Sequence, residues 1–173
     1  MRQLFAGCAL VAATLLGACV FESQSPLVPP GDYATPLTPG AYEMQERKDN
    51  GSFEKQEDVT LNVANNVYTL MASDGPMRFV LYRISPNIFL AQVTDEPDEN
   101  VYALVEPDAA GAAITHLPCK SLNVEERTRF HLSADTQSSC VFSTLDDVVT
   151  AALYLKGRGE APSLKLVRRQ DAR

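Results

Sequence analysis

The two histidines of this chain, His116 and His131, are the side chains best suited to proton transfer near neutral pH. A zinc site would need them together with a third ligand, and Asp135 and Glu125 are the carboxylates that could join them across predicted strands. Neither histidine belongs to an H-E-x-x-H pattern or to a comparable metal spacing. We therefore interpret both as ordinary surface or half-buried residues and expect no metal site.

Nucleophilic catalysis has no motif in this sequence. Ser138, Ser139 and Ser143 lie near Cys140, but there is no G-x-S-x-G elbow and nothing marks one serine as activated by a base. Gly-rich phosphate loops, Walker motifs and dinucleotide fingerprints are absent as well. The sequence therefore predicts no catalytic residue, no bound cofactor and no enzymatic activity.

Acidic side chains gather at two places that could bind a cation or transfer protons. Four carboxylates within 95–99 could attract calcium, but they lack the D-x-[DN]-x-[DN]-G spacing and enclose Pro97. A solvated hairpin loop is the better interpretation of that run. Asp146 and Asp147 stand at the start of a predicted helix, where carboxylates cap the helix and interact favourably with its dipole.

The chain begins with one positive charge at Arg2, an apolar stretch over 4–16 and then small residues, which is the anatomy of a secretory signal. About 13 apolar residues form a helix of roughly 20 Å, which is shorter than the ~30 Å hydrocarbon core of a bilayer. The stretch ends in Leu16-Gly17-Ala18-Cys19. We therefore expect this segment to direct export and not to remain as a membrane span.

Leu16-Gly17-Ala18-Cys19 resembles the lipobox of bacterial lipoproteins. The resemblance implies that the chain is cut after Ala18, that Cys19 carries diacylglycerol through a thioether, and that the new amino terminus is acylated with a fatty acid such as palmitate. Two or three acyl chains give stable membrane attachment, whereas one gives marginal binding. By analogy, Val20 after the cysteine favours an outer membrane, with the protein facing the periplasm of a Gram-negative bacterium. The alternative is an ordinary cleaved signal in which the cysteine has no role.

Removal of residues 1–18 discards Cys8 and, with Cys19 lipidated, leaves Cys119 and Cys140 as an even pair in an exported protein. We predict a disulfide between them. Closing a loop of about 20 residues stabilises a fold by roughly 3 kcal/mol in the chain-entropy model. A redox-active or metal-binding pair is the alternative, but it has no C-x-x-C spacing to support it.

The mature chain of 155 residues has the length of one domain. Five of the 11 prolines fall within 20–40, and this composition favours extended polyproline II structure. The sequence therefore predicts three parts: a signal peptide over 1–18, a lipidated cysteine with a Pro-rich tether over 19–40, and a single globular domain over 41–173.

Within that domain, short apolar alternations separated by turn residues predict an antiparallel β meander. Asn65-Asn66 is expected to form a hairpin turn, since asparagine tolerates positive φ. The aromatic side chains along these strands are interpreted as core and not as a ligand cage. We count about 7–9 strands, over residues 42–47, 59–63, 67–71, 77–84, 88–93, 101–106, 112–117, 129–132 and 164–166.

One α-helix is predicted over about 144–156. Ser143 or Thr144 can cap it, apolar residues recur at helical spacing from Leu145 to Leu153, and Lys156-Gly157 can end it. None of the predicted strands is separated from the next by a helix-length pattern, so a parallel sheet is not expected. The predicted fold is mainly β, a meander packed as a sandwich or a partly closed barrel, with this helix near the C-terminus.

The charge balance bears on the partners of the chain. Loss of Arg2 with the signal changes the formal net charge from −7 to about −8, and such an acidic surface argues against nucleic-acid binding. We expect contact with the membrane through the lipid anchor and, beyond it, contact with an envelope protein.

Three function classes remain open. The sequence favours a lipid-anchored structural or protein-interaction module. The second class is a carrier of a small apolar ligand in a barrel-like domain, although no lipocalin-like G-x-W signature is possible in a chain without tryptophan. The third is an envelope hydrolase, for which location is the sole argument. A filled barrel interior would exclude the carrier.

Overall fold

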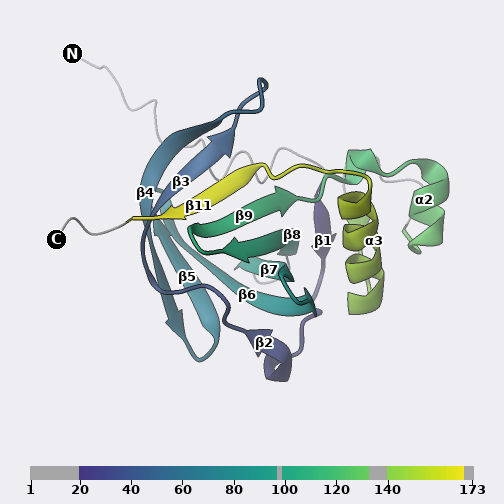
Figure 1. The fold of residues 1–173 in the computed structure, drawn as a ribbon. Helices are drawn as coiled ribbons and strands as arrows, with labels where there is room; N and C mark the ends of the chain where they lie inside the picture. Colours follow the sequence, from purple (N-terminus) through teal and green to yellow (C-terminus); the bar gives the residue numbers. More distant parts are fainter. Residues whose placement is uncertain (1–19, 97–98, 133–139, 170–173) are drawn as a thin grey trace, which may run out of the picture.

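Eight strands close into a single antiparallel barrel, which settles the choice between sandwich and barrel (Figure 1). The structure is a computed structural model that describes residues 20–96, 99–132 and 140–169. The mainly β fold with a C-terminal helix is confirmed. The barrel strands are β3 (Gly40–Arg47), β4 (Phe53–Ala64), β5 (Val67–Ala72), β6 (Gly75–Ser85), β7 (Ile88–Glu96), β8 (Glu99–Asp108), β9 (Gly111–His116) and β11 (Leu164–Arg168).

The barrel strands from β3 to β9 pair in chain order as a meander, as the sequence predicts. Strand β11 then pairs antiparallel with both β3 and β9 and so closes the barrel. The segment between β9 and β11 leaves the barrel and carries both α-helices that the structure describes. Neither is long and apolar enough to span a bilayer.

Two backbone features show how the sequence forms this barrel. Asn65 and Asn66 have φ of 53° and 62°, so the β4–β5 hairpin has the positive-φ turn that the sequence predicts. Gly111 begins β9 with φ of 153°, and a Cβ atom there would lie 1.8 Å from the carbonyl oxygen of Leu166. Glycine at this position therefore lets β9 approach β11 closely enough to pair with it.

Two hydrophobic cores share the middle strands. The first fills part of the barrel interior and includes Tyr68, Leu81 and Phe89. The second lies against the outer face of the barrel and includes Leu90 and Leu104. Strands β7 and β8 face both cores, which explains why their sequences are nearly continuous apolar runs instead of strict alternations.

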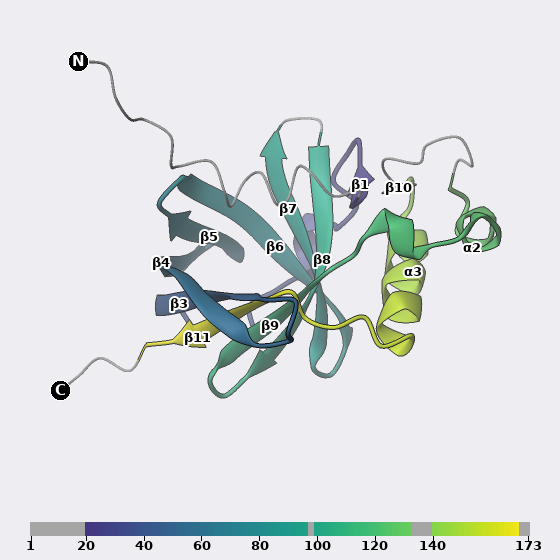
Figure 2. The ribbon, with the colours of Figure 1, turned by 90° about the horizontal axis from the view of Figure 1, so that it is seen from above.

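Helix α3 (Leu145–Gly157) covers the outer core, and the predicted helix over 144–156 is confirmed within one residue at each end. The hydroxyl of Thr144 accepts a hydrogen bond from the backbone N–H of Asp147, so Thr144 is the N-cap. Val148, Ala151, Ala152 and Leu155 form its buried face. In both views α2 (Val124–Arg129) lies beyond α3, on the side away from the barrel (Figures 1 and 2).

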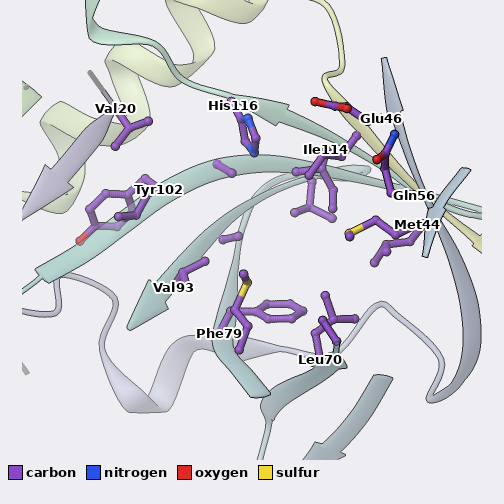
Figure 3. A pocket seen from close by; sticks show the side chains of 18 residues that line it. Val20, Met44, Glu46, Gln56, Leu70, Phe79, Val93, Tyr102, Ile114 and His116 are labelled. Carbon is purple, nitrogen blue, oxygen red and sulfur yellow. The ribbon is translucent and has the colours of Figure 1, made fainter. Parts of the chain in front are cut away.

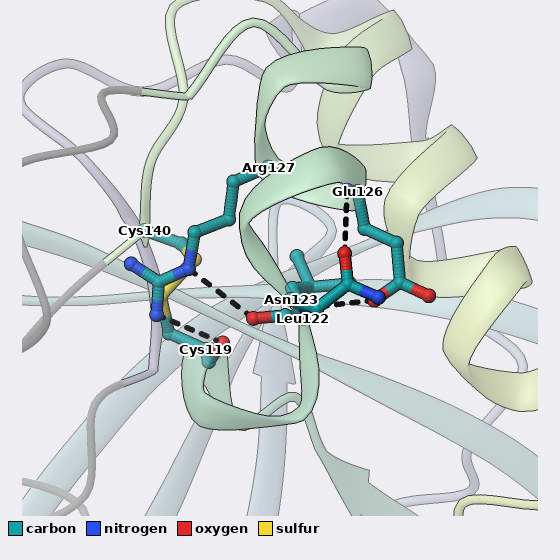
Figure 4. Close-up of a disulfide and its surroundings, with 6 residues drawn as sticks. All are labelled: Cys119, Leu122, Asn123, Glu126, Arg127 and Cys140. Carbon is teal, nitrogen blue, oxygen red and sulfur yellow. Dashed lines mark hydrogen bonds between the residues drawn. A yellow bond between two sulfur atoms is a disulfide. The ribbon is translucent and has the colours of Figure 1, made fainter.

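The predicted strand over 129–132 was wrong. Asn123 caps α2 in a reciprocal capping box with Glu126 (Figure 4). The chain then turns at His131, where φ is 57°. The apolar and polar residues of 129–132 alternate as in a strand, but the capping box directs the preceding residues into a helix. The alternation reflects burial of Phe130 and Leu132 in the outer core.

The predicted disulfide between Cys119 and Cys140 is present, with Cα atoms 5.4 Å apart (Figure 4). Cys119 lies in a short 3-10 turn, η2 (Cys119–Ser121), and Cys140 begins β10 (Cys140–Val141). Arg127 of α2 donates hydrogen bonds to the carbonyl oxygens of Leu122 and Cys119, each at 3.3 Å. The bridge therefore joins η2, and α2 through Arg127, to β10.

The predicted Pro-rich tether was wrong from Val20 onward, because this stretch packs on the barrel. It forms β1 (Phe21–Ser23), a 3-10 turn η1 (Pro30–Asp32) and β2 (Tyr33–Ala34). Strand β1 pairs with β8 and β10, and β2 pairs with β6. Four apolar side chains of this stretch are buried: Val20, Phe21, Val28 and Leu37. The domain therefore begins at least 20 residues earlier than predicted.

A buried glutamine holds this N-terminal stretch in place. Gln92 of β7 is 2% exposed, and its side-chain oxygen accepts hydrogen bonds from the backbone N–H groups of Leu27 and Val28 at 2.8 and 2.9 Å. The hydroxyl of Tyr102 lies 3.3 Å from the same oxygen and 2.7 Å from the hydroxyl of Ser23. Extended proline-rich backbone cannot pair with itself, and Gln92 supplies part of the missing hydrogen bonding.

Candidate functional site

The barrel contains an apolar pocket of about 130 Å³ (Figure 3). Phe79, Leu70 and Val93 lie on one side of the open space, and Ile114 and His116 lie on the other. Most lining side chains are aliphatic, aromatic or methionine. The polar ones are Glu46, Gln56, Tyr102 and His116. An engineered cavity of similar volume binds benzene, so this pocket has room for a few carbon atoms.

Strand topology defines the two ends of the pocket. At one end, the mouth end, β3 turns into β4, β5 turns into β6, β7 and β9 end, and β8 and β11 begin. The hairpins β4–β5, β6–β7 and β8–β9 lie at the other end, the closed end. Glu46, His116 and Leu164 line the pocket near the mouth end, whereas Met44, Phe79 and Leu166 line it deeper in the barrel.

The closed end is sealed by the N-terminal stretch. Leu37 belongs to the barrel-interior core and is 6% exposed. Its backbone N–H donates to the hydroxyl of Tyr68 at 2.9 Å, and that hydroxyl donates to the Leu37 carbonyl at 3.0 Å. The hydroxyl of Tyr42 donates to the carbonyl of Thr38 at 2.6 Å. Two tyrosines from the barrel wall thus fix Leu37 as a plug, and the pocket lies on the mouth side of it.

The polar side chains that line the pocket near the mouth end include an ion-paired carboxylate and a neutral imidazole. The ammonium of Lys48 lies 2.9 Å from a carboxylate oxygen of Glu46, which balances the negative charge there. Burial lowers the pKa of His116, and the charge of Glu46 opposes this effect only in part. The imidazole is therefore neutral at neutral pH, and Gln56 has no charge. This arrangement suits a polar group without a strong negative charge.

The structure does not bring the two histidines into one site. His116 lies at the mouth of the pocket, whereas Nδ1 of His131 lies 3.0 Å from a carboxylate oxygen of Asp147 on α3. Glu125 lies in the first turn of α2, and Asp135 lies outside the described residues. Within 20–96, 99–132 and 140–169, no group of three His, Cys, Asp or Glu side chains could hold a metal ion.

The other residues that the sequence analysis considers for chemistry either make structural contacts or lie outside the described residues. Asp147 serves the N-cap of α3 through Thr144, and hydrogen bonds from Thr144 and His131 lower the pKa of Asp147 against the opposing effect of burial. Strands β7 and β8 extend into the predicted acidic loop as far as Glu96 and from Glu99 onward. Ser138, Ser139 and Cys19 lie outside the described residues.

The sequence interpretation kept a ligand-binding barrel open as an alternative but identified none of the residues that line the pocket. Apart from Tyr102, which belongs to the outer core, the lining residues of β6 to β8 have the inward positions of alternating strands, and the sequence alone favours a filled core there. Ala91 and Ala103 are paired across β7 and β8, and both line the pocket. Small side chains at two facing positions leave room inside a barrel, which is the feature of the sequence that could have indicated a cavity.

The fold and the pocket together define a class: a closed antiparallel barrel of eight strands with an apolar internal pocket that is plugged at one end. Comparison of the chain with protein-family models, with curated proteins and with solved structures finds no match. The residues of the pocket are therefore the basis for the function proposed below.

Proposed function

We propose that this protein is a lipid-anchored binding protein that holds a small apolar or weakly polar ligand inside its barrel. The single observation that carries the proposal is the apolar pocket of about 130 Å³ between the Leu37 plug and the mouth end. A structural module gains nothing from such a space, because unfilled volume in a core costs stability. A binding protein requires it.

The pocket surface indicates the chemistry of the ligand. Its deep part offers aliphatic and aromatic side chains and the thioether of Met44, which favour a hydrocarbon group. Glu46, Gln56 and His116 near the mouth can accept or donate hydrogen bonds, and none of these three lining side chains is a permanent cation that could hold a carboxylate or phosphate. The preferred ligand is therefore an uncharged amphiphile with its hydrocarbon end in the barrel.

Attachment to a membrane is part of this proposal. Its support is the lipobox resemblance of Leu16-Gly17-Ala18-Cys19, which implies diacylglycerol and a fatty acyl group on Cys19. We place the protein at the outer membrane, facing the periplasm of a Gram-negative bacterium. An envelope protein that delivers or receives the ligand is the expected partner. Cys19→Ser is expected to abolish lipid labelling and release the domain, and persistent membrane attachment would contradict the anchor.

The binding proposal is tested with neutral n-alkanols of increasing length. The protein is exported without its anchor, with an ordinary cleavable signal in place of residues 1–18 and with Cys19→Ser, because all contacts described above lie within 20–169. Dissociation constants are measured by calorimetry. Burial of each methylene contributes about 0.8 kcal/mol, so each added carbon should tighten binding about fourfold until the pocket is full.

Two matched variants make this test specific. Ala91→Leu adds three carbon atoms inside the pocket and should weaken alkanol binding at least about tenfold. Ala109→Leu makes the same change in the exposed β8–β9 turn and should leave binding unchanged. Ala103→Val is a smaller filling change from the facing strand, for use if Ala91→Leu does not fold. Equal binding by wild type and the folded pocket variants would overturn the proposal.

A further inference from the structure

The pocket mouth and the start of the described chain are in the same place. Val20, the first described residue, lines the pocket and is 8% exposed. It forms an antiparallel bridge with Pro118, two residues after β9 ends at the mouth. Figure 3 shows Val20 beside Tyr102, with its side chain at one edge of the pocket. The chain is thus part of the mouth end at Val20.

Backbone hydrogen bonds hold Val20 firmly in this position. The N–H of Cys140 donates to the Val20 carbonyl at 3.2 Å, and the N–H of Phe21 donates to the Leu117 carbonyl at 3.1 Å. Cys140 is joined to Cys119 by the disulfide, and Phe21 is fully buried in the outer core. The position of Val20 is therefore set by β8, β10 and the segment after β9, and not by a loose N-terminal arm.

This geometry removes the spacer that the sequence predicts. Twenty residues of polyproline II structure would have held the domain up to roughly 60 Å from the bilayer. The same residues instead pack on the barrel after Val20. Consecutive Cα atoms are about 3.8 Å apart, so a lipid on the residue that precedes Val20 is attached one residue from the mouth.

We infer that the barrel is held with its mouth facing the membrane and that its occupant is one alkyl chain of a lipid from that membrane. This inference rests on the proposed function and names the ligand class and its source. An anchor one residue from the mouth leaves a lipid little distance to travel through water. A chain end that moves from bilayer to pocket exchanges one apolar environment for another, which avoids most of the cost of exposing it to water.

The pocket limits how much of the lipid can enter. A volume of about 130 Å³ accepts the end of one alkyl chain and not a whole diacyl lipid, and the Leu37 plug prevents deeper entry. The head group would stay outside, near the Glu46–Lys48 pair and His116. Since these groups give no net positive charge, a zwitterionic or uncharged head group fits the mouth better than an anionic one.

The test uses the complete chain with its own signal, purified after lipidation and reconstituted in vesicles of phosphatidylethanolamine and phosphatidylglycerol. A phosphatidylcholine with a diazirine at the end of one acyl chain is included as the photoreactive probe. After irradiation, labelled peptides are identified by mass spectrometry. We expect labels on deep pocket residues such as Met44, Phe79 and Leu166, and at least a fivefold loss of these labels in Ala91→Leu but not in Ala109→Leu.

Three other outcomes would overturn the inference. They differ in which ligand they assign to the pocket and in whether the proposed function survives. Labels confined to the outer surface, with alkanol binding intact in both forms of the protein, would mean that the pocket takes a ligand from the periplasm. Absence of pocket labels, together with alkanol binding in the anchorless form alone, would mean that the protein's own acyl chain fills the pocket. Loss of both labelling and alkanol binding would overturn the proposed function as well.

Discussion

At the scale of single residues, Gln92 shows how one polar side chain fixes a segment that its composition alone would leave extended. We predict that Gln92→Leu lowers the free energy of unfolding by about 1–3 kcal/mol, because the N–H groups of Leu27 and Val28 lose their acceptor in a buried site. Urea denaturation measures the change. The control is Gln56→Leu at the partly open mouth, which should change stability less, and equal losses would contradict the assigned role of Gln92.

His116 gives the folded protein a sensitivity to acid. Burial lowers its pKa in the native state below the ordinary value of 6.5, so the unfolded chain binds the proton first as pH falls. Stability should therefore decrease once pH drops below about 6.5 and stop decreasing below the native pKa, with a slope of at most about 1.4 kcal/mol per pH unit. His116→Gln should lose less stability than wild type between pH 7.5 and 5.5 in urea denaturation. An equal loss of stability in His116→Gln and wild type would show that other titratable groups cause the pH dependence.

At the scale of elements, prediction from sequence succeeded where the pattern was local. The β4–β5 hairpin depends on two adjacent asparagines, and α3 depends on Thr144 and a periodic apolar face. Prediction failed over 20–40, where the proline content suggested a tether. The contacts that hold this stretch on the barrel come from Gln92 and from the edges of β6 and β8, which are distant in the chain. A composition rule contains no information about such partners.

The disulfide is the clearest prediction at this scale, because it links η2 covalently to β10 within the outer core. We predict that the double variant Cys119→Ala with Cys140→Ala lowers the free energy of unfolding by roughly 3 kcal/mol, the value for a closed loop of about this length. Hydrogen exchange should rise most at the β1–β10 pairing, where Cys140 N–H meets the Val20 carbonyl. Reduction of the wild type should reproduce the loss, and an unaffected β1 would contradict the role given to the bridge.

At the scale of the whole molecule, the candidate site was less predictable than the fold. Which strands alternate could be deduced from the sequence, but whether a barrel interior is filled depends on the summed volumes of side chains from all eight strands. Facing Ala91 and Ala103 leave space that Phe79 and Met44 do not fill. The mouth depends on the bridge from Val20 to Pro118 and on the pairing of β1 with β8, which join distant parts of the chain and follow from no local pattern.

Because β7 and β8 belong to both cores, we expect the barrel and α3 to unfold together. Leu61→Ala in the barrel interior and Val148→Ala in the outer core should each lower the stability of one shared transition, by about 2–5 kcal/mol for leucine and somewhat less for valine. Far-UV circular dichroism follows the sheet and helix, and near-UV circular dichroism follows buried tyrosines such as Tyr68. Coincident curves are expected in both variants.

Leu153→Ala on α3, where the side chain is 38% exposed, is the control and should change stability by less than about 0.5 kcal/mol. If Val148→Ala instead separated an early loss of helix from a later loss of the barrel, the two cores would be independent units, and the outer layer could not be what holds Val20 at the pocket mouth.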